Sequence, residues 1–139
     1  MRHALIFGLA LVWVTMAAGA RQVRGRGNPE AATIKNPVAA DAASIASGRE
    51  TFQRHCASCH GADGKGGIVN SLVEDRGGPP TPDLTDDQWD FGSSDGEIFF
   101  AVKNGTPPDL FMGPWDGRLT DTEIWNVVNY VKSLATRKK

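Results

Sequence analysis

The segment Cys56-Ala57-Ser58-Cys59-His60 determines how the rest of this 139-residue sequence is interpreted. Cys56 and Cys59 are the only cysteines in the sequence, so a scaffold built on several disulfides is excluded. Residues three apart lie on one side of a helical turn, which places the two thiols together with the imidazole of His60 directly after them. We therefore expect the chemistry of the protein to lie at this turn.

Several kinds of site use closely spaced cysteines. A redox-active dithiol is typical of a βαβ setting, of which the sequence gives no sign. Zinc needs four well-spread ligands, whereas His55 and the motif fall within six residues. A disulfide between Cys56 and Cys59 would close a small, strained loop. The pattern favours haem c, in which both thiols add to the vinyl groups of one haem and His60 becomes an axial ligand of the iron.

The residues before the motif predict a helix over 41–56. Ile45, Gly48 and Phe52 share one face of it. A glycine inside a helix costs about 1 kcal/mol relative to alanine. Its presence on the buried face therefore indicates that another backbone crosses closely there.

Two further helices follow the motif, each after a capping box. Ser-x-x-Glu precedes an apolar face over 95–104, and Thr-x-x-Glu precedes another over 121–136. No stretch alternates strictly between apolar and polar residues, which indicates little or no sheet. The loops at 61–94 and 105–119 are long for a domain of this size, so we expect a bound group to fill part of the centre.

The N-terminal part reads as a targeting segment. Residues 1–20 have a positive start, an apolar run and small residues ending at Ala20, which predicts a secretory signal cleaved there. The alternative is an uncleaved membrane anchor, because the 17 uncharged residues up to Ala20 are just long enough. Residues 21–40 are interpreted as a flexible leader and 41–139 as the functional domain. The expected location is the periplasm, with no membrane span after cleavage.

Met112 is the candidate for the second axial ligand. The other two methionines and one histidine leave with the signal, and His55 is tied to the same helix as the motif. Met112 stands 52 residues after His60, in a loop with prolines on both sides that can hold a thioether rigidly over a ring. The alternative is that Met112 fills the core, which is the commoner role of methionine.

Taken together, these features resemble the class I cytochromes c, which carry one haem with His and Met axial ligands. The resemblance covers about 45–135. Gly48 and Phe52 precede Cys56 by eight and four residues, as in the first helix of that family, and Phe111-Met112-Gly113-Pro114-Trp115 is similar to its methionine loop. The resemblance implies an all-α cytochrome c fold, with three to five helices and long loops wrapped around one covalently bound haem c.

The resemblance also implies roles for a further segment. Thr81-Pro82-Asp83-Leu84 is similar to the Pro-x-Leu segment of the family. There the carbonyl of Pro82 would accept a hydrogen bond from the ring N–H of His60, and Leu84 would pack on the haem. The implied haem-binding residues are Cys56, Cys59, His60, Met112, Pro82 and Leu84, with the iron held by His60 and Met112.

Such a centre favours a single-electron carrier over an enzyme. With both axial positions filled, the iron could not easily bind oxygen or peroxide. The expected role is electron transfer between periplasmic or membrane redox partners, either as a free carrier or as the cytochrome subunit of a dehydrogenase or oxidase. The alternative is a catalytic or gas-sensing haem protein in which Met112 is displaced from the iron.

The distribution of charged residues along the sequence indicates which kinds of partner the protein can bind. The 15 Lys and Arg residues nearly balance the 16 Asp and Glu residues, which gives no electrostatic case for nucleic-acid binding. Acidic residues dominate 41–131, whereas 21–40 and 132–139 are basic. This acidic body could dock a basic redox partner, or it could serve solubility alone. The spacing of the aspartates over 83–97 fits no EF-hand, so calcium is disfavoured.

Overall fold

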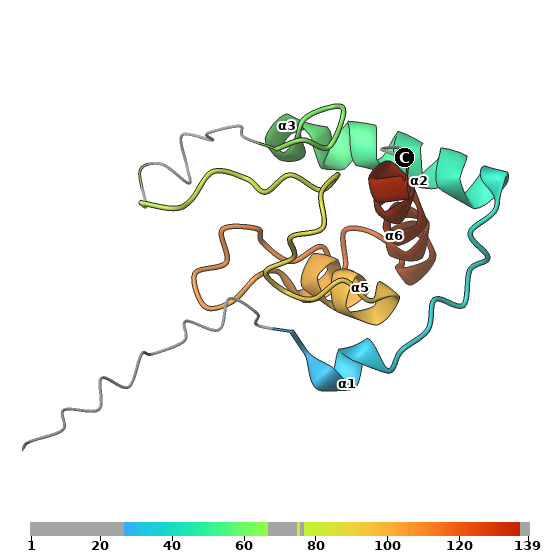
Figure 1. Cartoon of the computed structure of the whole chain (residues 1–139), viewed down its shortest axis with the longest axis horizontal. Helices are drawn as coiled ribbons and strands as arrows, with labels where there is room; N and C mark the ends of the chain where they lie inside the picture. The colour runs from blue at the N-terminus through green and yellow to red at the C-terminus, as the bar shows by residue number, and fades with distance from the viewer. Residues whose placement is uncertain (1–26, 67–74, 76, 137–139) are drawn as a thin grey trace, which may run out of the picture.

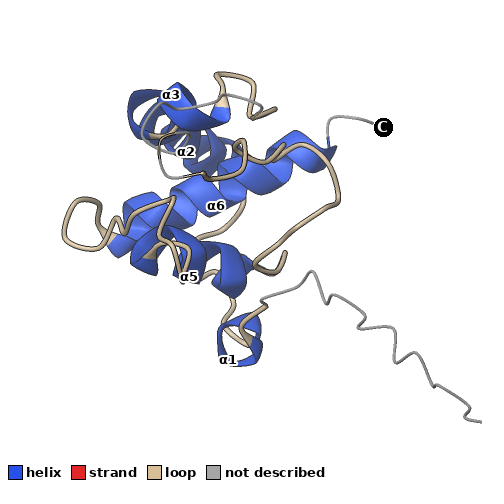
Figure 2. Cartoon of the chain, turned by 90° about the vertical axis from the view of Figure 1, so that its left-hand side faces the viewer, coloured by secondary structure: helices blue, strands red, loops and turns tan. Residues whose placement is uncertain are grey.

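The computed structural model describes residues 27–66, 75 and 77–136. Within them the chain is helical, and the elements appear in Figures 1 and 2: α1 (Pro29–Ala32), α2 (Ala42–His55), α3 (Ala57–His60), α5 (Asp95–Asn104) and α6 (Asp121–Thr136). No strand occurs in this described part, where an isolated bridge pairs Asp116 with Leu119. The all-α prediction is confirmed. The predicted signal over 1–20 lies outside the described residues.

The largest helix contact is the crossing of α2 and α6, where Gly48 permits a close approach (Figure 1). A Cβ atom built on Gly48 would lie 1.9 Å from the carbonyl oxygen of Asn126 and 3.0 Å from Cβ of Tyr130. No other side chain would fit at this position without moving the α6 backbone. The close crossing inferred from the glycine is thus present, and α6 is the helix that crosses.

Two clusters of buried side chains form the core on either side of α6. One lies between α2 and α6, and the other between α5 and α6. The first comprises Phe52, Val127, Tyr130, Val131 and Leu134. The second comprises Ile98, Trp125 and Val128. Partly buried Trp89, from the loop before α5, packs against both clusters and joins them.

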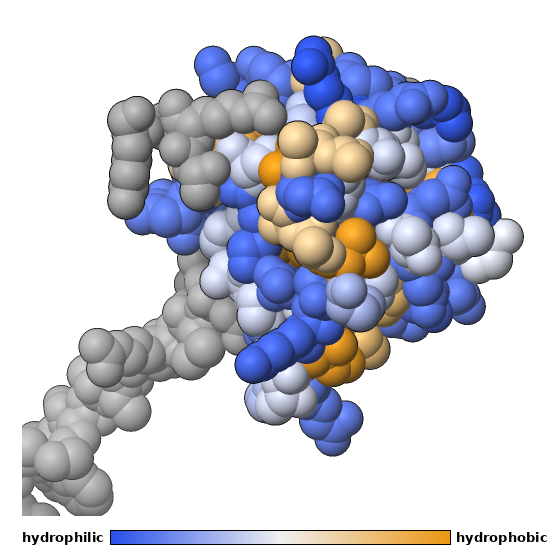
Figure 3. Space-filling model, turned by 90° about the vertical axis from the view of Figure 1, so that its right-hand side faces the viewer, coloured by the Kyte–Doolittle hydropathy of each residue, from blue (hydrophilic) through white to orange (hydrophobic). Residues whose placement is uncertain are grey.

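The surface is largely polar. On the face drawn in Figure 3, hydrophobic side chains form a narrow strip between hydrophilic ones. Three large hydrophobic side chains are exposed among the described residues: Ile34, Phe100 and Leu110. None of the helices found within the described ranges is long and apolar enough to cross a membrane.

Residues 27–40 lie against the domain, which differs from the flexible leader expected over 21–40. Asn28 caps α1 by accepting hydrogen bonds from two backbone N–H groups of that helix. The carbonyl oxygen of Ala31 would be only 2.0 Å from a Cβ atom on Gly96, so α1 abuts α5 closely. The Asn-Pro pair that begins α1 is a helix-start signal of the sequence.

Asn129 on α6 connects this segment and α2 to the last helix. Its side-chain nitrogen donates to the carbonyls of Val38 (3.2 Å) and Ala39 (3.3 Å) and to Oγ of Ser44 (2.8 Å). Its side-chain oxygen accepts from Nδ2 of Asn36 at 2.8 Å. Asn36 and Ser44 also donate to the carbonyl of Trp125 and the side-chain oxygen of Asn126, respectively, so the buried side chain of Asn129 is the centre of a polar network between the three segments.

Asn129→Ala is expected to lower the free energy of unfolding by about 2 kcal/mol, since it leaves buried polar groups without partners. Urea denaturation followed by circular dichroism measures this loss. Asn104→Ala, at the exposed end of α5, is the control and should change stability by about 0.5 kcal/mol or less. Equal losses in the two variants would contradict the role of Asn129.

The capping box at the start of α6 makes stability depend on pH. Glu123 accepts hydrogen bonds from the backbone N–H (2.8 Å) and hydroxyl (2.7 Å) of Thr120, and these bonds lower the pKa of Glu123, the backbone one most. A carboxyl with a lowered folded-state pKa stabilises the fold above its unfolded pKa of about 4.3. This stabilisation is lost as the pH falls through the folded-state pKa.

Glu123→Gln should therefore be less stable than the parent protein at neutral pH, with the difference shrinking below about pH 4.3. Urea denaturation of both proteins at pH 7, 5 and 3 tests this. A difference that stays constant down to pH 3 would show that the ionised carboxylate is not what stabilises the helix start.

Candidate haem attachment site

The motif forms one tight turn between α2 and α3. Cys56 ends α2, and its N–H donates to the carbonyl of Phe52 at 2.8 Å. The carbonyl of Cys56 in turn accepts from the backbone N–H groups of Cys59 (3.1 Å) and His60 (2.9 Å). The backbone thereby fixes the two sulfur-bearing residues and the histidine relative to one another, and all three are half-buried.

The two cysteines are not joined in a disulfide. Burial, and secondarily the nearby Cys59, raises the pKa of Cys56 to about 11. Reactive dithiols and thiolate metal ligands have lowered pKa values instead. In the described part of the chain, no group of three or more His, Cys, Asp or Glu side chains could hold a metal ion. The raised pKa of Cys56 disfavours the dithiol alternative.

The imidazole of His60 lies inside the domain near the ring of Phe52, with 6.4 Å between ring centroids. Burial lowers the pKa of His60, which favours the neutral imidazole. Nδ1 is buried and has no hydrogen-bond partner among the described residues. An axial histidine uses one ring nitrogen for iron and needs a hydrogen bond for the other. An imidazole that favours the neutral form, beside two cysteines that are not joined in a disulfide, therefore fits a covalently attached haem.

The segment 81–84 lies beside the motif. The hydroxyl of Thr81 donates to the carbonyl of Cys59 at 2.7 Å, and the N–H of Leu84 donates to the carbonyl of Gly64 at 2.7 Å. The half-buried side chain of Leu84 joins the cluster around Phe52, which Cys56 also contacts. Leu84 is thus placed close to the attachment turn.

The carbonyl of Pro82 does not accept the hydrogen bond that the resemblance implies. The hydrogen bond from the ring N–H of His60 to its carbonyl is absent, since Nδ1 of His60 has no partner in the described part. The Pro82 carbonyl oxygen instead faces Gly66, where a built Cβ atom would lie 2.2 Å away. Gly66 adopts a φ of +62°. Glycine is favoured at this position for two reasons: a side chain would collide with the Pro82 carbonyl, and residues with a side chain rarely adopt a positive φ.

Met112 lies on the loop that joins α5 to α6, and its side chain is half-buried. The carbonyl of Met112 accepts from the N–H of Thr106 at 3.0 Å, and the N–H of Met112 donates to the hydroxyl of Thr106 at 3.3 Å. Gly105 makes room for this pairing, because a Cβ atom there would be 2.7 Å from the Met112 carbonyl oxygen. The backbone of Met112 is therefore fixed at the C-terminal end of α5.

Ring contacts between this loop and the residue before the motif were not predicted from the sequence. The ring of His55, the last residue of α2, meets the ring of Trp115 edge-on at a centroid distance of 5.6 Å. The guanidinium of Arg118 lies 4.1 Å from the Trp115 ring centroid. The isolated sequence held no periodic signal for these two contacts, because both depend on how the loop folds back.

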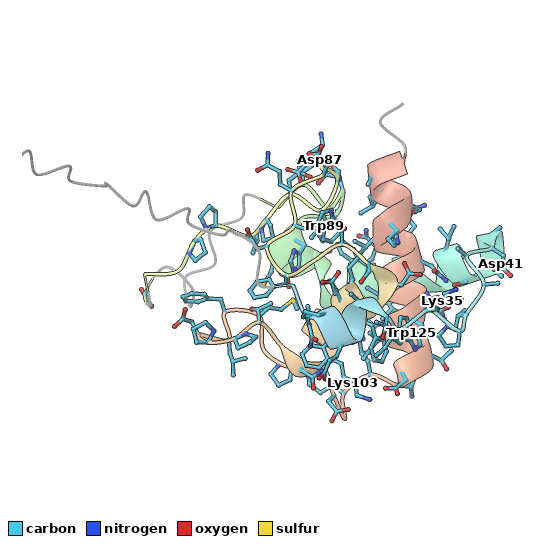
Figure 4. The ribbon with its side chains drawn as sticks, turned by 60° about the horizontal axis from the view of Figure 1, so that its bottom comes forward. Lys35, Asp41, Asp87, Trp89, Lys103 and Trp125 are labelled. Carbon is cyan, nitrogen blue, oxygen red and sulfur yellow. The ribbon has the colours of Figure 1, made fainter. Side chains whose placement is uncertain are left out.

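Ion pairs and a stacked aromatic pair join α5 to α6 and to the loop before α6; Lys103 and Trp125 are labelled in Figure 4. Lys103 near its end pairs with Asp121 at 2.7 Å and Asp116 at 3.7 Å, and these partners raise the pKa of Lys103. Trp125 on α6 stacks on Phe99 of α5 with a centroid distance of 3.9 Å. Stacking and ion pairs together hold α5 and the start of α6 in one arrangement.

Two curated relatives match most of this chain. It is 32% identical over 103 residues to the cbb3-type cytochrome c oxidase subunit CcoP of Azospirillum sp. (strain B510), covering 74% of this chain and 33% of that protein. It is 34% identical over 93 residues to the subunit FixP of Bradyrhizobium sp. (strain ORS 278), covering 67% and 28%. The chain thus spans about a third of the length of these relatives.

Solved structures share the fold. Cytochrome cL from Methylophaga aminisulfidivorans matches with a TM-score of 0.53 and 26% identity, over 67% of this chain and 56% of that one. A chain of the reducing HAO-like protein complex of Kuenenia stuttgartiensis matches with a TM-score of 0.60 and 25% identity, over 74% and 48%. The model of the family "Cytochrome C oxidase, cbb3-type, subunit III" matches residues 43–131. This chain therefore belongs to that family and has the cytochrome c fold that its sequence predicted.

Proposed function

We propose that this chain transfers single electrons through one covalently attached haem c, as an exported cytochrome that serves an oxidase of the cbb3 type. The observation that carries this proposal is the turn over 56–60, where two cysteines that are not joined in a disulfide stand beside an imidazole whose buried Nδ1 has no hydrogen-bond partner among the described residues. The relatives support the oxidase, since they are named as subunits of one. Residues 1–20 would direct export to the periplasm.

Haem c, when bound, supplies an iron that passes between ferrous and ferric states. Cys56 and Cys59 would hold it through thioethers, and His60 and Met112 would take its two axial positions. Filling both positions leaves none open to oxygen or other small ligands, which favours electron transfer over catalysis or gas sensing. A thioether ligand also favours the reduced state.

Two neighbouring residues would support the imidazole and the porphyrin. We propose that the carbonyl of Pro82 accepts the hydrogen bond that Nδ1 of His60 lacks once the haem is attached. The Thr81 hydroxyl, on the residue before Pro82, already holds this segment against Cys59. Leu84, already packed among the apolar side chains next to Cys56, would exclude water from the same side.

We propose that the surface of this protein that meets its redox partner is acidic. Asp86, Asp87 and Asp90 lie close together in the loop before α5. Asp87, which is labelled in Figure 4, and Asp90 are exposed. Opposite charge accelerates the encounter of redox proteins and makes it depend on ionic strength. A basic redox partner would therefore fit this region.

The absorption spectrum of Met112→Ala tests the proposal. The parent ferric protein should show the weak red-edge band of methionine-ligated haem and should not bind cyanide or carbon monoxide readily. Met112→Ala should lose the band, bind both ligands and have a lower potential. Leu110→Ala, an exposed position of the same loop, is the matched control. An unchanged spectrum in Met112→Ala would refute the ligand assignment, and a parent protein with an open iron would favour the catalytic or gas-sensing alternative.

A further inference from the structure

The loop that carries Met112 is anchored to α5 at both ends. Besides the pairing of Met112 with Thr106, the N–H of Trp115 donates to the carbonyls of Val102 (3.2 Å) and Lys103 (3.1 Å). The next N–H, of Asp116, also donates to the carbonyl of Lys103, at 3.0 Å. These bonds satisfy carbonyls at the C-terminal end of α5 that would otherwise lack partners. The loop consequently moves with α5.

Within the described residues, α5 does not pack against α2 or α3, the two helices that meet in the turn over 56–60. It packs against α1 and α6, whereas α2 packs against α6 and α3. The positions of Met112 and His60 relative to one another would therefore depend on α6 and on Trp89, which packs against both core clusters, unless a direct contact joins the loop to the turn over 56–60.

The side chain of Trp115 makes that direct contact. One edge of its ring meets His55, which is followed immediately by Cys56. The guanidinium of Arg118 covers the ring at 4.1 Å from its centroid. The carbonyl of Trp115 also accepts from the N–H groups of Arg118 and Leu119, each at 3.0 Å. Its backbone is thus fixed to α5 and its ring to the end of α2.

We propose that Trp115 is a positioning residue that holds the Met112 loop against the α2–α3 turn and thereby sets how firmly the Met112 thioether keeps its axial position. The inference rests on the proposed function. Trp115 acts through the loop, because its anchoring bonds begin three residues after Met112. Without the ring, the loop would follow α5 alone, and an external ligand could displace the thioether more easily.

Binding of imidazole to the ferric holoprotein, followed by visible absorption, measures this competition. Aromatic and cation–π contacts of this kind contribute roughly a factor of ten in an equilibrium constant. Trp115→Leu should therefore raise the imidazole affinity about tenfold, whereas Trp115→Phe, which keeps a ring, should stay within about twofold of the parent. Arg118→Gln should give a smaller rise, since it removes only the cation.

Trp125→Leu is the matched control. It removes a stacked tryptophan from the α5–α6 interface, so it should lower the melting temperature more than Trp115→Leu does. Its imidazole affinity should nevertheless stay within about twofold of the parent. Circular dichroism confirms that each variant is folded at the temperature of the titration.

Two results would overturn the positioning role: an imidazole affinity in Trp115→Leu within about twofold of the parent, or an equal rise in Trp125→Leu. Met112→Ala separates this failure from failure of the proposed function. If Met112→Ala binds imidazole more tightly than the parent while Trp115→Leu does not, only the role of Trp115 is wrong. If Met112→Ala binds imidazole as the parent does, Met112 is not an axial ligand and the proposed function fails in that respect.

Discussion

Gly48→Ala is expected to destabilise the protein by about 3 kcal/mol or more, because the added methyl group has no space at the α2–α6 crossing. Its carbon would lie 1.9 Å from the carbonyl oxygen of Asn126 and 2.5 Å from the carbonyl carbon. Both are backbone atoms in the middle of α6, so relief requires the helices to separate. Urea denaturation of the holoprotein and its melting temperature measure the loss.

The sign of this effect distinguishes crowding from helix propensity. Alanine favours a helix over glycine by about 1 kcal/mol, so an uncrowded Gly48→Ala would stabilise α2. Ser47→Ala, on the exposed side of α2, is the control and should raise stability by a few tenths of a kcal/mol. A Gly48→Ala variant as stable as the parent would mean that α6 does not cross α2 so closely.

The double variant Cys56→Ala/Cys59→Ala should lose covalently attached haem completely, since no other cysteine is present in the chain. Intact mass under denaturing conditions, after maturation in a host that attaches haem c, reports attachment directly. The parent should carry the mass of one haem, and each single variant should retain part of the attachment through the remaining sulfur.

Ser58→Ala, an exposed position between the two cysteines, is the control and should carry the added mass of one haem, as the parent does. Haem mass retained in the double variant, or bare polypeptide in the parent, would refute covalent attachment at this turn. The second result would remove the basis of the proposed function as well.

Elements with local signals were predicted well from the sequence. The capping boxes placed the starts of α5 and α6 at Asp95 and Asp121, where the structure has them. The glycine on the apolar face of α2 predicted the close crossing, because a helix tolerates glycine poorly without a packing reason. The motif over 56–60 predicted the cytochrome c family, since few sites combine two thiols and an imidazole at that spacing, and the family model and solved structures confirm it.

Features that depend on tertiary contacts were not predicted. Helix α1 has four residues, which is too short to be stable by propensity, and it depends on packing against Gly96 instead. Trp115 was noticed only as part of the methionine loop, because its contact with His55 joins residues 60 positions apart. The role of Pro82 rested on resemblance alone and remains a proposal.

The position of Gly27, the first described residue, affects where a tag or label can be added to the protein. Gly27 lines a cavity of about 320 Å³ together with Gly105 and Pro107, the residues that begin the Met112 loop. An affinity tag or carrier fused upstream would consequently emerge beside that loop and hinder approach to it. Fluorophores or surface linkers for kinetic work are better placed on the exposed side of α2, where Ala46 and Ser47 face solvent.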